Sequence, residues 1–221
     1  MTYNWSFGTV WLYHNLVVEA IGVTLWLSLL VILLTLPLSV MIVLIRTSRF
    51  KLAILLVRWT IEFVRSIPPL VFVVWIYYCL PIVLGVKLSA VQTVVVALSI
   101  YSSVFFAEIF RSGIQSIEPG FLEAAYSAGM TRLTAFRRIT APLAFRNTFP
   151  AFISQCVLVL KSTSLASVVA VPELLYTGQR ISIEIFRPME VLTVIALVYV
   201  AMIMPLTFVG NHLEARWIKR V

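Results

Sequence analysis

The feature that most constrains this chain is a run of 26 residues, 20–45, without a single charged side chain. An α-helix rises ~1.5 Å per residue, so a helix of that length exceeds the ~30 Å hydrocarbon core of a bilayer. The composition agrees, because 61% of all residues are hydrophobic and the mean hydropathy is +1.02. A soluble domain with a polar surface cannot be made from such a chain. The sequence therefore predicts an integral membrane protein.

Four further apolar segments follow the first. We expect one all-α transmembrane domain, 1–221, with five membrane spans at residues 19–45, 59–80, 89–110, 149–171 and 190–209. Residues 1–18 carry aromatic side chains but no Lys or Arg. A secretory signal needs a basic start, so we expect this segment to lie in the membrane interface as an amphipathic stretch. Residues 118–150 form a polar, cationic island between two spans.

The positive charges predict a direction of insertion. Five spans place the two ends on opposite sides, and one side then holds twelve cations, against three on the other. The twelve are Arg46, Arg49, Lys51, Arg58, Arg111, Arg132, Arg137, Arg138, Arg146, Arg216, Lys219 and Arg220, and the three are Lys87, Arg180 and Arg187. Because cytoplasmic loops are enriched in Lys and Arg, we expect the amino end outside, the carboxyl end inside and residues 118–150 in the cytoplasm.

The inventory of reactive side chains argues against an enzyme. The nine acids are all Glu, and the two histidines, His14 and His212, lie far apart. There is no Gly-x4-Gly-Lys-Ser/Thr segment either, so we expect no Ser-His-Asp set, no metal cluster and no nucleotide loop. Cys79 and Cys156 each lie in an apolar segment and are interpreted as packing residues. The net charge of +8 clusters beside the apolar runs and therefore indicates cytoplasmic loops, not nucleic acid binding.

The polar island has the local signals of two short helices. Pro119 suits a first helical turn, and Gly129 suits the left-handed residue that closes a helix. Thr131 can cap a second helix, and Pro142 is expected to stop or kink that helix where the chain returns to the bilayer. We therefore expect a helix-turn-helix elbow at the membrane surface.

The order of residues in this elbow resembles the EAA loop of ABC importer permeases. The matching positions are Glu123, Ala124, Ala125, Gly129, Ile139 and Pro142. Ala141 departs from the family pattern, which usually has Leu there. The resemblance implies a coupling helix that docks into a groove of a separate ATPase, where Glu123 pairs with a basic residue and the two alanines allow close approach. The competing interpretation is that Glu-Ala-Ala is only a helix-forming tripeptide.

Three other segments extend the resemblance to permeases for polar amino acids. They are residues 62–70, 107–117 and 161–165. The last of them resembles Lys-Asp-Thr-Ser-Leu, with Ser162 in place of the acid. The chain thus resembles the permease subunit of a bacterial polar amino acid importer, related to those for glutamate/aspartate, glutamine, histidine and arginine.

This resemblance implies the type I ABC importer permease fold in the bacterial inner membrane, working by alternating access. The implied partners are a dimer of ATP-binding subunits, a second permease chain, identical or homologous, a periplasmic amino-acid-binding protein and membrane lipid. ATP and Mg belong to the ATPase, and no cofactor or metal is expected on this chain. The alternative is an ATP-independent secondary transporter or channel, which would need ion-coupling acids in mid-membrane. Only Glu62 would suit that role.

Arg65 and Pro68 are candidate substrate or gating residues. An ionised group in mid-bilayer costs ~2.5–3.5 kcal/mol on insertion scales, so it normally has a partner or a water-filled cavity. Arg65 could bind a substrate carboxylate, or it could simply be neutralised by Glu62 three residues before it. Pro68, followed by Pro69, is expected to break the helix, which membrane proteins tolerate mainly beside cavities.

Gln155, Lys161, Thr163 and Ser164 are the remaining substrate candidates. Permeases of this family that carry cationic amino acids often have Glu where Gln155 stands. A neutral amide leaves acidic or neutral substrate side chains preferred. Lys161, Thr163 and Ser164 would supply a cation and two hydroxyl groups. They could equally be helix-packing residues, and Lys161 an interface anchor.

Overall fold

The computed structural model describes residues 4–218, and every element of secondary structure in them is helical. The elements are α1 (Gly8–Trp11), α2 (His14–Arg46), α3 (Lys51–Ser66), α4 (Pro69–Tyr78), α5 (Leu80–Leu84), α6 (Ala90–Gln115), α7 (Pro119–Ser127), α8 (Arg132–Ala135), the π-helical η1 (Phe136–Thr140), α9 (Ala141–Ser162), the 3₁₀-helical η2 (Thr163–Val169), α10 (Leu174–Ile185) and α11 (Pro188–Ile218). Four helices are long and apolar enough to cross a membrane, and the bent pair of α3 and α4 is a candidate for a fifth span.

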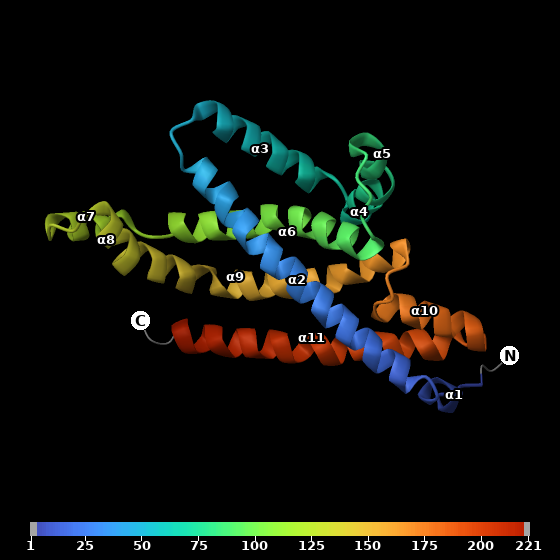
Figure 1. Ribbon diagram of the computed structural model, residues 1–221. Helices are drawn as coiled ribbons and strands as arrows, with labels where there is room; N and C mark the ends of the chain where they lie inside the picture. Colours follow the sequence, from blue (N-terminus) through green and yellow to red (C-terminus); the bar gives the residue numbers. More distant parts are fainter. Residues whose placement is uncertain (1–3, 219–221) are drawn as a thin grey trace.

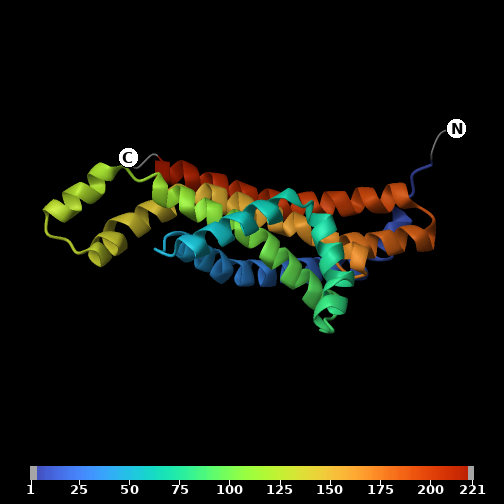
Figure 2. The ribbon, with the colours of Figure 1, turned by 90° about the horizontal axis from the view of Figure 1, so that it is seen from above.

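The long helices form an elongated bundle around α6. Helix α2 crosses α6 obliquely, α9 runs beside α6, and α11 packs against α9 and α10 (Figures 1 and 2). Helices α7 and α8 project from one end of the bundle, while α1 and α10 lie at the other end. The chain thus begins at one end of the bundle, and α11 runs back toward the other, as expected for an odd number of spans.

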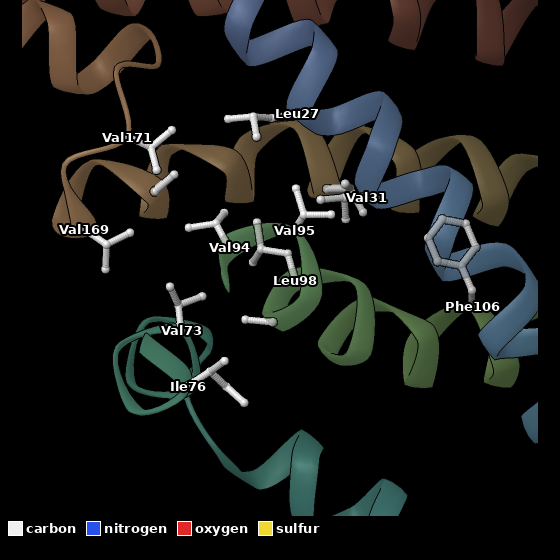
Figure 3. Packing of buried hydrophobic residues seen from close by; sticks show 13 residues of the cluster. Leu27, Val31, Val73, Ile76, Val94, Val95, Leu98, Phe106, Val169 and Val171 are labelled. Carbon is white, nitrogen blue, oxygen red and sulfur yellow. The ribbon is translucent and has the colours of Figure 1, made fainter. Parts of the chain in front are cut away.

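The main core lies where α2, α4, α6, α9 and η2 meet. Leu27 of α2, Val73 of α4, and Leu98 and Phe106 of α6 are among its fully buried side chains (Figure 3). The Phe106 ring also meets the Phe152 ring of α9 edge-on, with centroids 5.4 Å apart. The helix surfaces that remain outside this core carry exposed leucines and tryptophans, as expected of a surface that contacts lipid.

Hydroxyl groups hold α2 against α6. Thr35 Oγ1 donates to the Ser99 carbonyl oxygen at 3.4 Å, and Ser99 Oγ donates to the Val31 carbonyl oxygen at 3.3 Å. All three residues are buried. Small hydroxyl residues let helix backbones approach closely and hydrogen-bond across the contact, which is common between membrane helices.

The predicted break at Pro68 is present. Helices α3 and α4 are bent by 103° about Ile67 and Pro68. Pro68 disfavours the α conformation in the residue before it, and Ile67 accordingly has an extended backbone with ψ 130°. The segment predicted as one span at 59–80 is therefore two helices, and neither is long enough to cross a bilayer by itself.

Several predicted boundaries differ from the observed ones. Helix α2 begins at His14, so the end of the predicted interfacial segment belongs to the first long helix. Pro142 does not stop the second short helix, because α8, η1, α9 and η2 form one candidate span over Arg132–Val169. The π-helical turn η1 ends at Thr140, and Pro142 lies in the first turn of α9, which follows directly. The chain thus stays helical past this proline. Lys219 and Arg220, counted among the predicted inner cations, lie outside the described residues.

Candidate functional site

The projecting elbow has the local structure that its sequence predicts. Pro119 is the first residue of α7, and Gly129 closes that helix with φ +76°. The Gly129 and Met130 amides then donate back to carbonyl oxygens of α7 at 3.0 Å each. Thr131 caps α8, because its Oγ1 accepts from the Thr134 amide at 3.3 Å. Together these contacts turn the chain through a tight corner between the two short helices.

The motif residues face in different directions. Glu123 and Ala124 are exposed on α7, whereas Ala125 is only 3% exposed. Ile139 is half-buried in η1, and Pro142 is exposed in the first turn of α9. Of the Glu-Ala-Ala tripeptide, the surface therefore presents only the carboxylate and one methyl group. The third residue packs inward.

The elbow that carries Glu123 also carries exposed apolar side chains. Large hydrophobic residues there are about half exposed; they are Phe121, Tyr126, Leu133 and Phe136. The elbow extends beyond the helices of the bundle (Figure 2). The exposed surface of the elbow thus combines apolar side chains with Glu123 and with charged residues, a mixture found at protein contacts; the other exposed charged residues are Glu118, Arg132, Arg137 and Arg138.

Polar contacts fix the helices at the base of the elbow. Asn147 Nδ2 of α9 donates to Ser116 Oγ at 2.8 Å, which joins the two ends of the elbow. Glu108 binds Arg111 of its own helix, with Arg111 Nη2 2.6 Å from Glu108 Oε2, and also forms an ion pair with Arg46 of α2. Glu108 and Arg111 lie three residues apart on α6, a spacing that brings two helical side chains together. The part played by Arg46 was missed, because 62 residues separate it from Glu108 and no spacing rule connects them.

A hollow of about 340 Å³ lies between α9 and α11, and we call it the α9 hollow. Its lining includes Ser154, Val157, Lys161, Thr207 and Gly210, and no carboxylate is among its lining residues. Lys161 is exposed, and its ammonium group makes no ion pair within the described part of the chain. The α9 hollow therefore offers the Lys161 cation and the Ser154 hydroxyl group, whereas the Thr207 hydroxyl donates to the Ile203 carbonyl oxygen at 3.2 Å.

The other α9 candidates do not join Lys161 in this hollow. Gln155 is half-buried and is not among the lining residues. Thr163 is fully buried and donates to the Leu160 carbonyl oxygen at 2.7 Å, while Ser164 donates to the Lys161 carbonyl oxygen at 2.8 Å. Both hydroxyl groups are thus used inside their own helical turn. Ser154 and Thr207, which do line the hollow, were missed by sequence reasoning because isolated hydroxyl residues in apolar helices carry no distinctive pattern.

Arg65 lies on another helix, and the single chain does not bring it into the α9 hollow. Its guanidinium group stands 5.9 Å from the centroid of the Phe105 ring on α6. Arg65 and Glu62 are both exposed, and no ion pair joins them in the described structure. The alternative in which Glu62 neutralises Arg65 is therefore not seen, and the guanidinium group makes a cation–π contact with Phe105 next to the Pro68 break.

Two buried acids at the opposite end of the bundle, Glu173 and Glu190, were not identified from the sequence. Glu173 caps α10, where its carboxylate accepts from the Leu175 and Tyr176 amides at 2.9 and 2.8 Å and from the Tyr199 hydroxyl at 2.9 Å. Glu190 accepts from Arg187 at 2.8 Å, beside the start of α11. Both acids are fully buried. Their partners make them structural anchors of α10 and α11.

Comparisons with known proteins agree with this architecture. Residues 36–219 match the family described as binding-protein-dependent transport system inner membrane component. The glutamine transport system permease protein GlnP of Escherichia coli K12 is 32% identical over 217 residues, which is 98% of each chain. The nopaline transport system permease protein NocM of Agrobacterium fabrum is 33% identical over 210 residues, 90% of this chain and 85% of that one. A crystal structure of an amino acid ABC transporter with histidines superposes with a TM-score of 0.90 at 30% identity, covering 97% of this chain and all of the other.

The fold and these matches define the class: the chain belongs to the inner membrane components of binding-protein-dependent transport systems. Such proteins are ABC transporter permeases, which lack catalytic residues because a separate subunit hydrolyses ATP. Within this class, the chain is the permease subunit of an amino acid ABC importer. Family membership favours the predicted ATP-driven importer over the alternative secondary transporter or channel.

Proposed function

We propose that this permease imports a polar amino acid with a neutral or acidic side chain, received from a periplasmic binding protein and released into the cytoplasm by alternating access. The observation that carries the proposal is the α9 hollow, which holds the Lys161 ammonium group and no carboxylate. A cation suits the carboxylate of any amino acid. A cationic side chain would find no opposite charge there.

Gln155 and the relatives support the same selectivity. An amide at Gln155 leaves this stretch of α9 without the negative charge that a cationic side chain needs. The Escherichia coli relative is named for glutamine, and so are two Bacillus subtilis relatives at 32% and 35% identity. A Bacillus subtilis relative named for arginine is 25% identical over 200 residues. A glutamine-like substrate is therefore the first to test.

The elbow is the proposed contact with the ATPase. In this proposal Glu123 and the exposed apolar side chains of α7 occupy a groove on an ATP-binding subunit, which carries ATP and Mg. A dimer of such subunits serves two permease chains, of which this is one. The proposal places the elbow in the cytoplasm of a bacterium, with the amino end of the chain outside.

Transport by the reconstituted importer tests this function. The permease would be purified with the proteins that accompany it, placed in proteoliposomes with its binding protein, and supplied with labelled glutamine and internal ATP. We expect ATP-dependent uptake that unlabelled glutamine or glutamate reduces and arginine does not. Better uptake of arginine than of either would overturn the proposed selectivity. Uptake that continues without ATP would overturn the importer mechanism.

A matched pair of variants isolates the selectivity. Gln155→Glu adds a negative charge to α9, and Gln155→Met changes the same position without one. We expect Gln155→Glu to raise arginine uptake relative to glutamine uptake, and Gln155→Met to leave that ratio unchanged. Equal ratios in the two variants would show that the charge at this position does not select the substrate.

A further inference from the structure

A second, smaller hollow of about 210 Å³ lies between the beginning of α2 and α10, and we call it the α2 hollow. Its lining includes Leu16, Glu19, Val23, Thr177, Arg180 and Glu184. Both signs of charge therefore face one small space, which is unusual for the surface of a membrane helix. Nothing in the transport proposal uses these residues.

The charges in this hollow are only partly neutralised. Glu184 accepts a hydrogen bond from the Tyr13 hydroxyl at 2.9 Å, which holds its carboxylate in place. Glu19 and Arg180 are exposed, and neither side chain makes an ion pair or hydrogen bond within the described residues. Arg180 is thus free although two carboxylates line the same hollow. The hollow leaves a guanidinium group and a carboxylate available to a ligand that carries both charges.

The position of the hollow along α2 corresponds to the head-group level of a bilayer. Helix α2 has 33 residues and a length of ~50 Å, about 20 Å more than the hydrocarbon core. Glu19 immediately precedes the uncharged run 20–45, so it lies at the end of the apolar stretch, where the helix is expected to leave the core. Trp11 is 74% exposed just before the helix, and Trp26 is 51% exposed further along it. Tryptophan gathers at membrane interfaces, so these two residues bracket the level at which Glu19 lies.

We propose that the α2 hollow binds the head group of an aminophospholipid, with Arg180 on the phosphate and Glu19 and Glu184 on the primary ammonium group. A guanidinium group pairs well with phosphate oxygens, and a primary ammonium group can donate to two carboxylates. Val23, which lines the hollow, and exposed Trp26 lie on the same face of α2 further into the membrane, where they can contact the acyl chains. The volume suits a head group better than a drug-sized ligand, which needs about 300 Å³ or more.

A free amino acid has the same two charges and is the other source of this chemistry. The apolar side chains on the membrane side of the hollow, Val23 and Trp26, favour the lipid, because a soluble ligand gains nothing from them. The inference does not depend on the proposed substrate. It also does not depend on the direction of insertion, since head groups occur on both surfaces of the membrane.

The test uses the full chain, purified with its native partners, stripped of lipid and placed in nanodiscs. One preparation contains phosphatidylethanolamine and a second contains phosphatidylcholine, whose trimethylated ammonium group cannot donate a hydrogen bond. Lipid retained after transfer to detergent is counted by native mass spectrometry. We expect selective retention of phosphatidylethanolamine. Equal retention of the two lipids by the wild-type protein would overturn the proposal.

Variants show where the lipid binds. Loss of one charge-assisted contact worth about 1.4 kcal/mol or more corresponds to at least about a tenfold weaker retention, so Glu19→Gln and Arg180→Gln should each show such a loss. Arg180→Lys should restore part of it, because the positive charge remains. Lys87→Gln, which removes an exposed cation elsewhere, should have no effect.

Two further results would count against the proposal. Unchanged retention of phosphatidylethanolamine by Arg180→Gln would show that the head group does not bind in this hollow. Displacement of phosphatidylethanolamine by free glutamine, but not by phosphoethanolamine, would identify an amino acid as the occupant.

Discussion

Gly113 of α6 packs so closely against Thr148 of α9 that a methyl group added at Gly113 would stand 2.0 Å from Thr148 Cγ2 and 3.0 Å from the Ala144 carbonyl oxygen. The crossing lies just before the elbow leaves α6 and soon after it enters α9. Gly113 has an ordinary helical conformation, so its backbone angles do not require glycine. Glycine is needed here because the two helix backbones approach so closely that a side chain would not fit. The crossing therefore sets the angle at which the elbow leaves the bundle.

Gly113→Ala should destabilise the permease by about 1–3 kcal/mol, the usual cost of forcing an extra methyl group into a packed contact. Thermal unfolding in detergent measures the effect. Gly120→Ala is the matched control, because a methyl group at Gly120 meets nothing within 4 Å. Equal stability of the two variants would show that α6 and α9 can separate without cost.

Gly129→Ala should weaken coupling to the ATPase more than it weakens the fold. Gly129 has φ +76°, and a residue with a Cβ atom pays about 1–2 kcal/mol in that conformation. Gly85 has φ +66° after α5 and, like Gly129, has open space around it. Gly85→Ala should thus cost similar stability while leaving transport-coupled ATP hydrolysis intact. Equal loss of hydrolysis in both variants would contradict a special role for the corner at Gly129.

Glu123→Lys should lower the ATP hydrolysis that the permease stimulates by about tenfold or more, because a like-charge contact in a docking groove costs at least about 1.4 kcal/mol. Membrane insertion should be unchanged, since Glu123 is exposed and has no hydrogen-bond partner in the described structure. Glu118→Lys makes the same charge change at an exposed position just before α7 and should have a smaller effect. Normal stimulation by Glu123→Lys would contradict the docking proposal.

The sequence was sufficient for features that depend on local chemistry. The length of the apolar runs predicted membrane helices, and Pro68 predicted the break that separates α3 from α4. Pro119, Gly129 and Thr131 predicted the corner of the elbow, because a proline ring, a left-handed residue and a capping hydroxyl act within a few residues of themselves.

Features that depend on three-dimensional contact could not be read from the sequence. Arg46 meets Glu108, and Tyr199 meets Glu173, only because helices far apart in the chain pack side by side. The sequence also did not show which way the side chains of α9 point. Lys161 and Ser154 line a hollow with Thr207 of α11, whereas Thr163 turns into the core. Polar residues of α9 occur at buried, half-buried and exposed positions alike, so hydropathy cannot tell which of them point into a shared space.

Lys161 provides the most direct test of the α9 hollow. If its ammonium group holds the substrate carboxylate, Lys161→Gln should raise the KM for uptake by about tenfold or more, since a charge-assisted hydrogen bond is worth about 1.5–3 kcal/mol. Lys161→Arg keeps the charge and should recover most of the affinity. An anchor that merely reaches the membrane interface would behave differently, because its loss would lower the stability of the protein and leave KM unchanged. Measuring KM together with the thermal unfolding temperature of both variants separates the two roles. A normal KM for Lys161→Gln would show that Lys161 does not bind the substrate.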